Sequence, residues 1–410
     1  MPNTLLTNQV ITYEALDVLE NTLNMTNRIN REYNDSFRFG GAVLGQTLNI
    51  RKPPRFIGRL GQATQVEGIA EQYVPLTLAF QRGVDTQVSS QDLSLRIDDY
   101  RDRILKPKIA RLANLVDQDV CSLVLGVNNC VGTPGTVPTS TAVVIGSNSA
   151  ATKLDNLAAP SEDRYVSMNP ATQGSIASST LASFNPTDAI AKSYRKGTLG
   201  MLGGFEWAMD QNVYVHTVGA LGASTPEVLN GSQSGASIIT DGWSSGTLNA
   251  GDVVQFENVY AVNSQSYQST GQLMDFVVTA TTSDAAGTMT IPISPAMVGP
   301  GSQLQNVTAL PADNADVFVF GVAAASFSTI TGKSTPQNLA YQKNFGTLAM
   351  VDLPLPGGTD KAYRASSKKA GISIRVIRDY IVTTDQWIER IDVLYGVTVM
   401  RQELACRIAA

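Results

Sequence analysis

The stretch ILKPKIARLANLVDQDVCSLV, residues 104–124, decides the fold expected for this chain. Its apolar residues recur at a spacing near 3.6, the period of an α-helix with one buried face. Pro107 follows Lys106, and a proline either starts a helix or kinks it. We expect a helix from residue 95 to about residue 125, roughly 30–45 Å long, about the diameter of a domain. The stripe expected to be buried comprises Ile104, Leu105, Ile109, Leu112, Val116, Val120, Leu123 and Val124.

The sequence before this helix predicts a long extended excursion. Residues 41–61, GAVLGQTLNIRKPPRFIGRLG, are polar and basic, and Pro53 and Pro54 exclude a helix or a central strand there. Residues 71–89 form the expected return limb, in which Val74, Leu76, Leu78 and Phe80 alternate with other residues. Because a lone two-stranded hairpin is only marginally stable in water, something else must cover it.

The N-terminal residues 12–29 predict an amphipathic helix. Thr12 is the expected N-cap, and Glu14 and Asp17 suit the positive end of the helix dipole. Several asparagines weaken the second half, so we expect the helix to fray or break there. The residues expected on the apolar face are Leu16, Leu19, Leu23, Met25 and Ile29.

After the long helix, the composition changes near Leu221. From there to about Val322 charges nearly vanish, and short apolar runs alternate with turn residues, a pattern typical of a small antiparallel barrel or sandwich. Ahead of it, RYVSM (residues 164–168) predicts a strand, and Pro170 predicts the start of a helix. The chain closes on two long predicted strands. The residues expected to share one face of the second are Ile391, Val393, Tyr395, Val397 and Val399.

Composition narrows the function classes. The chain has 410 residues, a net charge of −5 and scattered basic residues, which argues against a dedicated nucleic-acid binder. Its three cysteines, Cys121, Cys130 and Cys406, have no CxxC spacing, so we expect neither a disulfide framework nor a zinc site. This cysteine usage fits a protein of a reducing compartment. We also expect no signal peptide and no transmembrane helix.

Several motifs resemble catalytic or ligand-binding signatures. GWSSG (residues 242–246) matches G-x-S-x-G, but the only histidine, His216, lies upstream of Ser244, so a surface turn is favoured over a serine hydrolase. GKS (residues 332–334) lacks the first glycine of a phosphate-binding loop, since Phe327 stands there. An ordinary partly buried side chain is the favoured interpretation of His216. A helix N-terminus is favoured over a cation site for Asp98, Asp99 and Asp102. We expect no catalytic, cofactor-binding or metal-binding residues.

The order of these elements resembles the major capsid (coat) proteins of tailed bacteriophages, above all those of short-tailed Salmonella phages, which carry an inserted β-barrel domain. Nearly the whole chain is covered, in order. The stretches that carry the resemblance are VITYEALDVLENTLN (10–24), ILKPKIARLANLVDQDV (104–120), GTLNAGDVVQFENVYAVN (246–263) with MTIPISPAM (289–297), and DVLYGVTVMRQELACRIA (392–409). The stretch between Leu221 and Gly246 is short, so a loop that bridges neighbouring capsomers in that family is expected to be reduced.

The resemblance implies an α+β fold, the tailed-phage and herpesvirus major capsid protein fold, with an inserted antiparallel β-barrel. The implied segments are an N-terminal arm (1–38), an extended loop (39–90), a peripheral domain with the long helix (91–135), an axial domain in two parts (136–221 and 325–370), the inserted barrel (222–324), and closing strands of both domains (371–410).

The implied function is to build the icosahedral shell around phage double-stranded DNA. Such proteins form pentamers and hexamers of themselves, assemble a procapsid with a scaffolding protein in the host cytoplasm, and expand when DNA enters through a portal protein. Contact with DNA would be weak and non-specific, and no membrane is involved. The alternatives are an encapsulin-type compartment shell or another phage structural protein.

Two sets of contact residues follow. We expect the extended loop to pack on a neighbouring subunit through Arg51, Lys52, Arg55, Arg59, Leu76 and Leu78. Carboxylates near residues 98–102 of the neighbour would pair with the basic residues, for which a solvated basic face is the plainer alternative. We expect Glu14, Asp17 and Glu20 to contact a basic helix of the scaffolding protein, the plainer alternative being dipole complementation alone.

Overall fold

The computed structural model describes residues 8–33, 45–59, 61–89, 101–180, 200–356, 362–367, 371–381, 383 and 386–410. The predicted α+β class is confirmed, and the chain forms two compact units. The first unit comprises Met1–Ile50, Tyr73–Cys121 and Gly346–Thr398, and the second comprises Arg51–Gln72, Ser122–Phe345 and Val399–Ala410. The finer division into seven segments stays a prediction.

The long helix of the first unit is confirmed. A π-helical turn, Arg101–Leu105, leads into α3 (Lys106–Cys121), and a 3-10 turn, Ser122–Gly126, follows it. Pro107 stands in the first turn of α3, where a proline costs no helical hydrogen bond. The predicted stripe is buried from Leu105 to Val124, whereas Ile104 is half-buried. The expected start at residue 95 lies outside the described residues.

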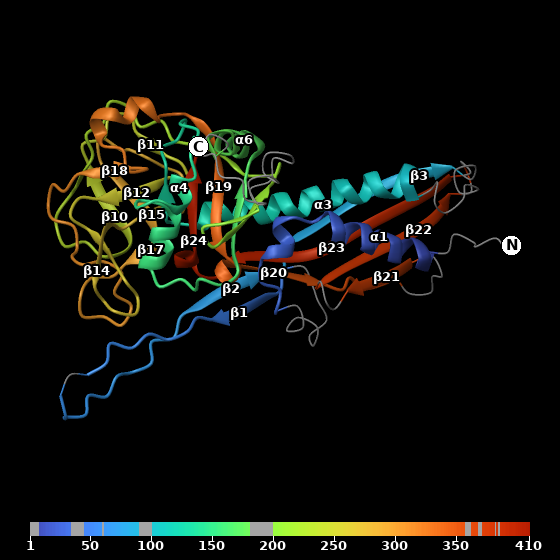
Figure 1. Ribbon diagram of the computed structural model, residues 1–410, viewed down its shortest axis with the longest axis horizontal. Coiled ribbons are helices and arrows are strands. Elements are labelled where there is room, and N and C mark those ends of the chain that lie inside the picture. Colours follow the sequence, from blue (N-terminus) through green and yellow to red (C-terminus); the bar gives the residue numbers. More distant parts are fainter. Residues whose placement is uncertain are drawn as a thin grey trace. The chain divides into compact units, whose positions relative to one another are not determined.

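A sheet of long strands packs with α1 and α3 in this unit (Figure 1). β3 (Phe80–Ser89) pairs with β23 (Gln386–Val399) in antiparallel register from Tyr395 opposite Phe80 to Gln386 opposite Ser89. The other strands are β20 (Gly346–Val351), β22 (Ile372–Ile381) and β21 (Ala362–Ser367). β23 is buried on both faces between Ile391 and Gly396, so the expectation of a single apolar face is incomplete.

Charged groups that sequence reasoning missed are buried on both faces of β23, Glu389 on the face of Ile391 and Asp392 on the opposite one. Glu389 is almost fully buried, and it accepts hydrogen bonds from Lys108 Nζ at 2.7 Å and Arg378 Nε at 2.9 Å. Asp392 is likewise buried and accepts from Arg375 and Arg390. Buried charges need such partners because an unpaired one would pay the full cost of losing its water.

The N-terminal helix α1 (Asn8–Thr22) starts earlier than expected. Thr12 is buried inside the helix, so it is not the N-cap, and the first turn holds no acidic residue, so Glu14 and Asp17 do not lie at the positive end of the dipole. The predicted break is confirmed, because α1 ends at Thr22 and a 3-10 turn, Met25–Arg28, follows. Asp117 of α3 fixes this turn by accepting the backbone N–H groups of Asn24 and Thr26. The five predicted apolar residues are buried.

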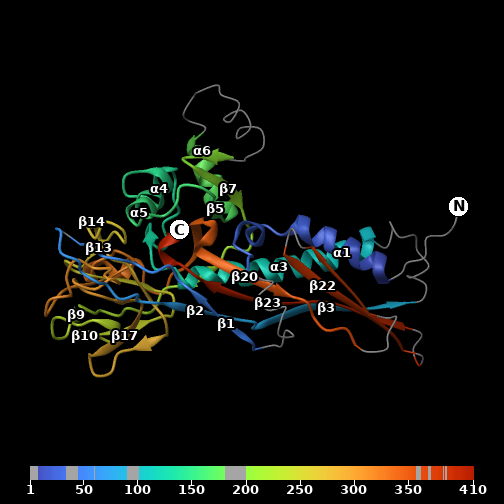
Figure 2. The ribbon, with the colours of Figure 1, turned by 90° about the horizontal axis from the view of Figure 1, so that it is seen from below.

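The second unit contains a seven-stranded sheet. RYVSM is confirmed as β5 (Arg164–Met168), and Pro170 begins α6 (Pro170–Thr180). Figure 2 shows α4 (Ala142–Ile145) beside α5 (Ala150–Asn156) in this unit. The remaining strands are β4 (Cys130–Val131), β24 (Ala405–Ala409), β19 (Ser334–Gln342), β7 (Phe205–Met209), β6 (Met201–Leu202) and β8 (Val215–Thr217), which pairs with β19.

The predicted antiparallel barrel is inserted between β8 and β19. Its strands follow the order β18–β12–β15–β17–β10–β9, and each pair among them is antiparallel. Hydrogen bonds from Val228 N to Ala315 O (2.9 Å) and from Val317 N to Pro226 O (3.0 Å) join β9 to the chain entering β18, so the sheet closes on itself. The strands are β9 (Glu227–Val228), β10 (Gly235–Asp241), β12 (Val253–Phe256), β15 (Phe276–Val278), β17 (Met289–Met297) and β18 (Val317–Val319).

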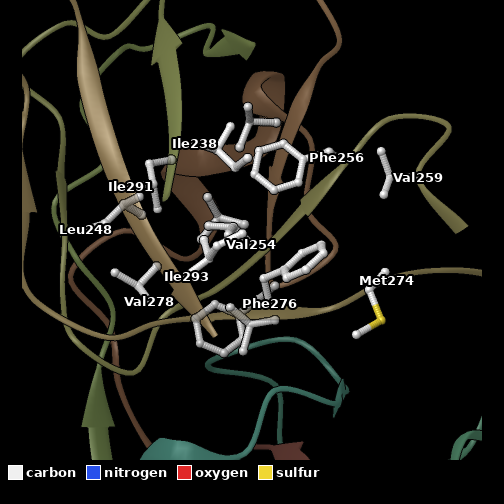
Figure 3. Packing of buried hydrophobic residues seen from close by; sticks show 14 of the residues in the cluster. Ile238, Leu248, Val254, Phe256, Val259, Met274, Phe276, Val278, Ile291 and Ile293 are labelled. Atoms are coloured by element: carbon white, nitrogen blue, oxygen red, sulfur yellow. The ribbon is translucent and has the colours of Figure 1, made fainter. Parts of the chain in front are cut away.

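Smaller pairs extend the barrel: β11 (Thr247–Leu248) with β16 (Thr282–Ser283), and β13 (Tyr260–Val262) with β14 (Ser269–Leu273). Figure 3 shows side chains from β10, β12, β15 and β17 converging inside. The rings of Phe256 and Phe276 lie 5.8 Å apart at the centre and are fully buried. Alternation along each strand places these residues inside, which is why a weakly charged, Gly- and Ser-rich sequence still encloses a core.

Candidate assembly site

The part of the extended loop that carries the predicted basic residues runs out between two short paired strands (Figure 1). β1 (Thr47–Arg51) pairs with β2 (Tyr73–Thr77), and the bond from Lys52 N to Gln72 O (2.8 Å) continues the pairing. We call Arg51–Gln72 the distal segment. Beyond Arg51 its described residues form no helix and no strand, and Gly58 and Gly61 take positive φ angles of 79° and 94°, which glycine adopts without strain.

Four large apolar side chains of the distal segment are exposed. Their exposed fractions are 53% for Phe56, 50% for Ile57, 92% for Val66 and 66% for Ile69. Sequence reasoning missed them because they do not alternate regularly and lie among glycines and charges. Exposed apolar side chains that gather in one patch mark an interaction surface, and these four are candidates for such a patch.

The apolar residues that we expected to need a neighbour are already covered. Leu76 and Leu78 are fully buried within the single chain, and Ile50 is nearly so. The reason for expecting Leu76 and Leu78 to contact another subunit therefore does not hold, while the contact itself stays a prediction. They belong to the core of the first unit, where the backbone of Thr77 and Leu78 passes so close to Gly396 that a Cβ there would not fit.

Glu67 fastens the two limbs of the distal segment to each other. Its carboxylate accepts the backbone N–H of Ile57 at 2.9 Å and that of Gly58 at 2.7 Å. The N–H of Ile57, above all, lowers the pKa of Glu67; partial burial opposes this, and the Gln303 amide and the N–H of Gly58 add to it. The carboxylate therefore stays ionised near neutral pH, and a loop without strand pairing has a defined shape.

The four predicted basic residues have partners in their own chain. Arg51 lies 3.5 Å from Glu71, Arg55 lies 3.7 Å from Glu403, and Arg59 Nη1 donates to the carbonyl of Gly61 at 2.6 Å. Lys52 is half-buried, and burial lowers its pKa although Glu403 opposes the change. The contact of these four residues with a neighbouring subunit stays a prediction, as does the alternative of a solvated basic face.

Three cationic side chains surround Glu403 near the start of the distal segment. Burial alone would raise its pKa, but Arg401, its own backbone N–H, Arg55 and Lys52 together lower it. Three cations around one carboxylate leave a local excess of positive charge.

The acidic residues proposed for a scaffold contact follow one another along α1. Asp17 is exposed, and Glu14 and Glu20 are half-exposed. Of the carboxylates proposed as partners of the loop, Asp98 and Asp99 lie outside the described residues. Asp102 is exposed and lies 2.6 Å from Lys106 Nζ of its own helix.

The described residues do not support the alternative of a serine hydrolase that uses Ser244 and His216. His216 is buried with its Nε2 2.8 Å from Asp252 Oδ1, whereas Ser244 lies in an exposed turn after β10. Ser334 of GKS begins strand β19 instead of a helix, so no phosphate-binding loop forms there. The cysteines are buried thiols, and burial raises the pKa of Cys130 to about 11.

Two further features can be stated for the described part of the chain. It holds no group of three or more histidine, cysteine, aspartate or glutamate side chains placed to bind a metal ion. None of its helices combines the length and the apolar character that crossing a bilayer requires.

One family model matches nearly the whole chain. The profile of the family described as P22 coat protein, gene protein 5, matches residues 3–407. A comparison with curated proteins found no match. Among solved structures, one of Mycobacterium phage Che8 is 12% identical with a TM-score of 0.47 and covers 94% of this chain and 90% of its own. The capsid of cyanophage P-SCSP1u is 12% identical with a TM-score of 0.43, covering 90% and 85%. The coat protein I-domain of CUS-3 is 20% identical with a TM-score of 0.20, covering 24% and 97%.

Proposed function

Because the chain belongs to the P22 coat protein family, it is a bacteriophage coat protein, and we propose that its copies assemble into a closed icosahedral shell around double-stranded DNA. The family predicted from the sequence is thereby confirmed, and the chain is a structural protein of the virion capsid. In our proposal the shell forms in the host cytoplasm as a procapsid with a scaffolding protein. It expands when DNA enters through a portal protein.

The observation that carries this proposal is the distal segment with its exposed Phe56, Ile57, Val66 and Ile69. Covering such side chains is favourable by roughly 25 cal/mol per Å² of apolar area removed from water. A second copy of the chain is the partner that a coat protein meets most often. We propose that the distal segment of each subunit packs on the next subunit of a pentamer or hexamer.

The contact would be head-to-tail. A contact between two different surfaces of identical subunits repeats around a ring until the ring closes. Arg51, Lys52, Arg55 and Arg59 would lie at the edge of this contact, where each exposed ion pair is worth only about 0–1 kcal/mol. The glycines at positions 58 and 61 would let one sequence serve both ring sizes. DNA would be held loosely, since the net charge of −5 gives no attraction for phosphates.

A loss-of-assembly experiment tests the proposal. Phe56→Ser and Ile69→Ser should leave the circular dichroism spectrum and thermal unfolding unchanged and abolish shells in negative-stain microscopy, with and without a scaffold partner. Val137→Ser is the matched control, since Val137 is 45% exposed in the same unit but outside the distal segment. Normal shells from both loop variants would refute the packing of this segment on a second copy.

A second contact is proposed for the scaffolding protein. Glu14, Asp17 and Glu20 would attract a basic helix of that partner inside the shell. Asp17→Lys should reduce scaffold incorporation, and the binding should weaken at high salt because exposed charges are screened. Full incorporation in Asp17→Lys would contradict this contact.

The alternative of an encapsulin-type compartment or another phage structural protein is less well supported. The family match spans nearly the whole chain, inserted barrel included. Measuring the mass of packaged nucleic acid in purified particles would distinguish a virion shell from these alternatives, since only a virion shell should contain a genome.

A further inference from the structure

The distal segment is fastened to the inserted barrel as well as to itself. Gln303 Nε2 donates to the carbonyl of Gly68 at 2.8 Å and to Glu67 Oε2 at 3.1 Å. Gln303 lies in the connection between β17 and β18, far from the distal segment in sequence. All of these residues belong to the second unit.

The position of Gln303 is fixed by the barrel. Tyr267 Oη donates to the carbonyl of Gln303 at 2.9 Å. Three residues further on, Asn306 N donates to Val298 O at 3.1 Å, and Asn306 O accepts from Val262 N at 3.0 Å. The connection is therefore held on one side by the end of β17 and on the other by β13. A side chain on such a connection points in a direction that the barrel determines.

A continuous path of hydrogen bonds then crosses the distal segment. It runs from Gln303 to the carboxylate of Glu67 on the return limb, and from that carboxylate to the N–H groups of Ile57 and Gly58 on the outgoing limb. Glu67 is one of the few half-buried residues in a segment that is otherwise mostly exposed. The exposed Ile57 and Ile69 lie within two residues of the atoms that this path joins.

We propose that Gln303 is a positioning residue through which the inserted barrel sets the direction of the distal segment for binding to a second copy of the chain. This inference rests on the proposed function, because it takes that binding as its outcome. A segment without strand pairing samples many directions, and ordering it on binding costs affinity. The hydrogen bonds of Gln303 restrict those directions before the partner arrives, so the barrel contributes to assembly without touching the neighbour.

The test compares two glutamines of the same connection. Gln303→Ala removes the bonds to the distal segment, whereas Gln305→Ala removes only a bond to Val307 O within the connection. Spin labels on cysteines introduced at Gln65 and Gln268, which are both exposed, report the distance between the distal segment and the barrel. The three native cysteines are buried and will not be labelled readily. Assembly is followed in parallel by light scattering of the full-length chain.

We expect Gln303→Ala to broaden the distance distribution and to slow assembly about three- to tenfold, the effect of one or two lost hydrogen bonds. Gln305→Ala should change neither. Equal behaviour of the two variants would overturn the proposal, as would slower assembly of Gln303→Ala with an unchanged distance distribution, or a broadened distribution with unchanged assembly.

Glu67→Gln is a second variant, which controls for the possibility that Gln303→Ala disturbs the folding of the barrel. Its site lies on the distal segment, outside the barrel, and it weakens the same path from the other side, so it should reproduce both effects. The distance measurement needs no assembly, so it separates this inference from the proposed function. If Phe56→Ser and Ile69→Ser both form normal shells, the packing of the distal segment on a second copy fails while the positioning by Gln303 can stand. If Gln303→Ala matches its control while the two loop variants do not assemble, only the positioning role fails.

Discussion

The inserted barrel and the distal segment belong to the same unit but complete their structures in opposite ways. The barrel closes its ring of strands and turns Phe256, Phe276, Ile291 and Ile293 inward (Figure 3). The distal segment has no strand pairing beyond its root and turns Phe56, Ile57, Val66 and Ile69 outward. Apolar side chains thus stabilise the fold in the first region and are available for association in the second.

The polar contacts differ in the same direction. In the barrel they complete a closed sheet, whereas in the distal segment Glu67, Arg59 and Gln303 define a shape that lacks a core of its own. A loop shaped by hydrogen bonds while its apolar residues stay exposed is preorganised for a partner. Substitutions in the barrel should therefore lower stability, whereas substitutions in the distal segment should lower assembly.

The largest effect is expected at the centre of the barrel. Phe276→Ala should lower the free energy of unfolding by about 3–5 kcal/mol, since it leaves a cavity in a closed core. Phe56→Ala, the same change on the distal segment, should alter it by no more than about 0.5 kcal/mol. Urea unfolding of the two unassembled variants measures both. A similar loss in the two variants would mean that Phe56 belongs to a core after all.

The extended loop itself holds both kinds of apolar residue, the buried Leu76 and the exposed Ile69. Leu76→Ala should cost about 2–4 kcal/mol because Leu76 is fully buried, and Ile69→Ala should cost almost nothing. In an assembly assay of folded protein, Ile69→Ala should be impaired more than Leu76→Ala. A stable Leu76→Ala monomer that cannot assemble would restore the original expectation that Leu76 waits for a neighbour.

The sequence was sufficient to predict the elements whose signal is periodic. The helix around Ile109 and Val116 and the barrel strands follow the 3.6-residue and two-residue patterns that burial imposes. The family resemblance then added the order of the domains. The exposed apolar residues of the distal segment gave no such signal. A local sequence pattern does not distinguish an apolar residue that stays exposed in the single chain from one that a distant strand covers.

The buried charges show the same limit. Glu389 and Asp392 lie on a strand whose sequence, ERIDVLYG, indicates one apolar and one solvated face. They are buried because Lys108, Arg378 and Arg375 approach from α3 and β22, elements distant in sequence. Long-range pairing of this kind can be read only from the fold. For the same reason the partners of Arg55 and Glu67 could not be predicted.

A smaller effect is expected at the root of the distal segment. Arg55→Ala should lower the free energy of unfolding by only about 0–1 kcal/mol, because the pair with Glu403 is 3.7 Å long and partly exposed. The difference from the wild-type chain should shrink in high salt, which screens exposed charges. Urea unfolding at low and high salt measures it. A loss that is large and independent of salt would place Arg55 among the buried, structural charges.

The smallest effect concerns acid and the shape of the distal segment. The pKa of Glu67 is lowered in the fold, chiefly by the N–H of Ile57, so its contribution is present above the unfolded pKa, about 4.3, and is lost as pH falls through the lower folded value. Hydrogen-exchange protection factors of a peptide containing Ile57 and Gly58 should therefore stay constant from neutral pH to about pH 4.3 and decrease below it. Barrel peptides containing Val254 and Val277 serve as the internal control, because their protection comes from strand pairing. Glu67→Gln should show the lower protection at every pH. If acid instead lowers protection in the barrel first, the hydrogen bonds of the distal segment are more stable to acid than those of the barrel. That result would contradict the contrast between a barrel stabilised by its own core and a loop held by the Glu67 carboxylate.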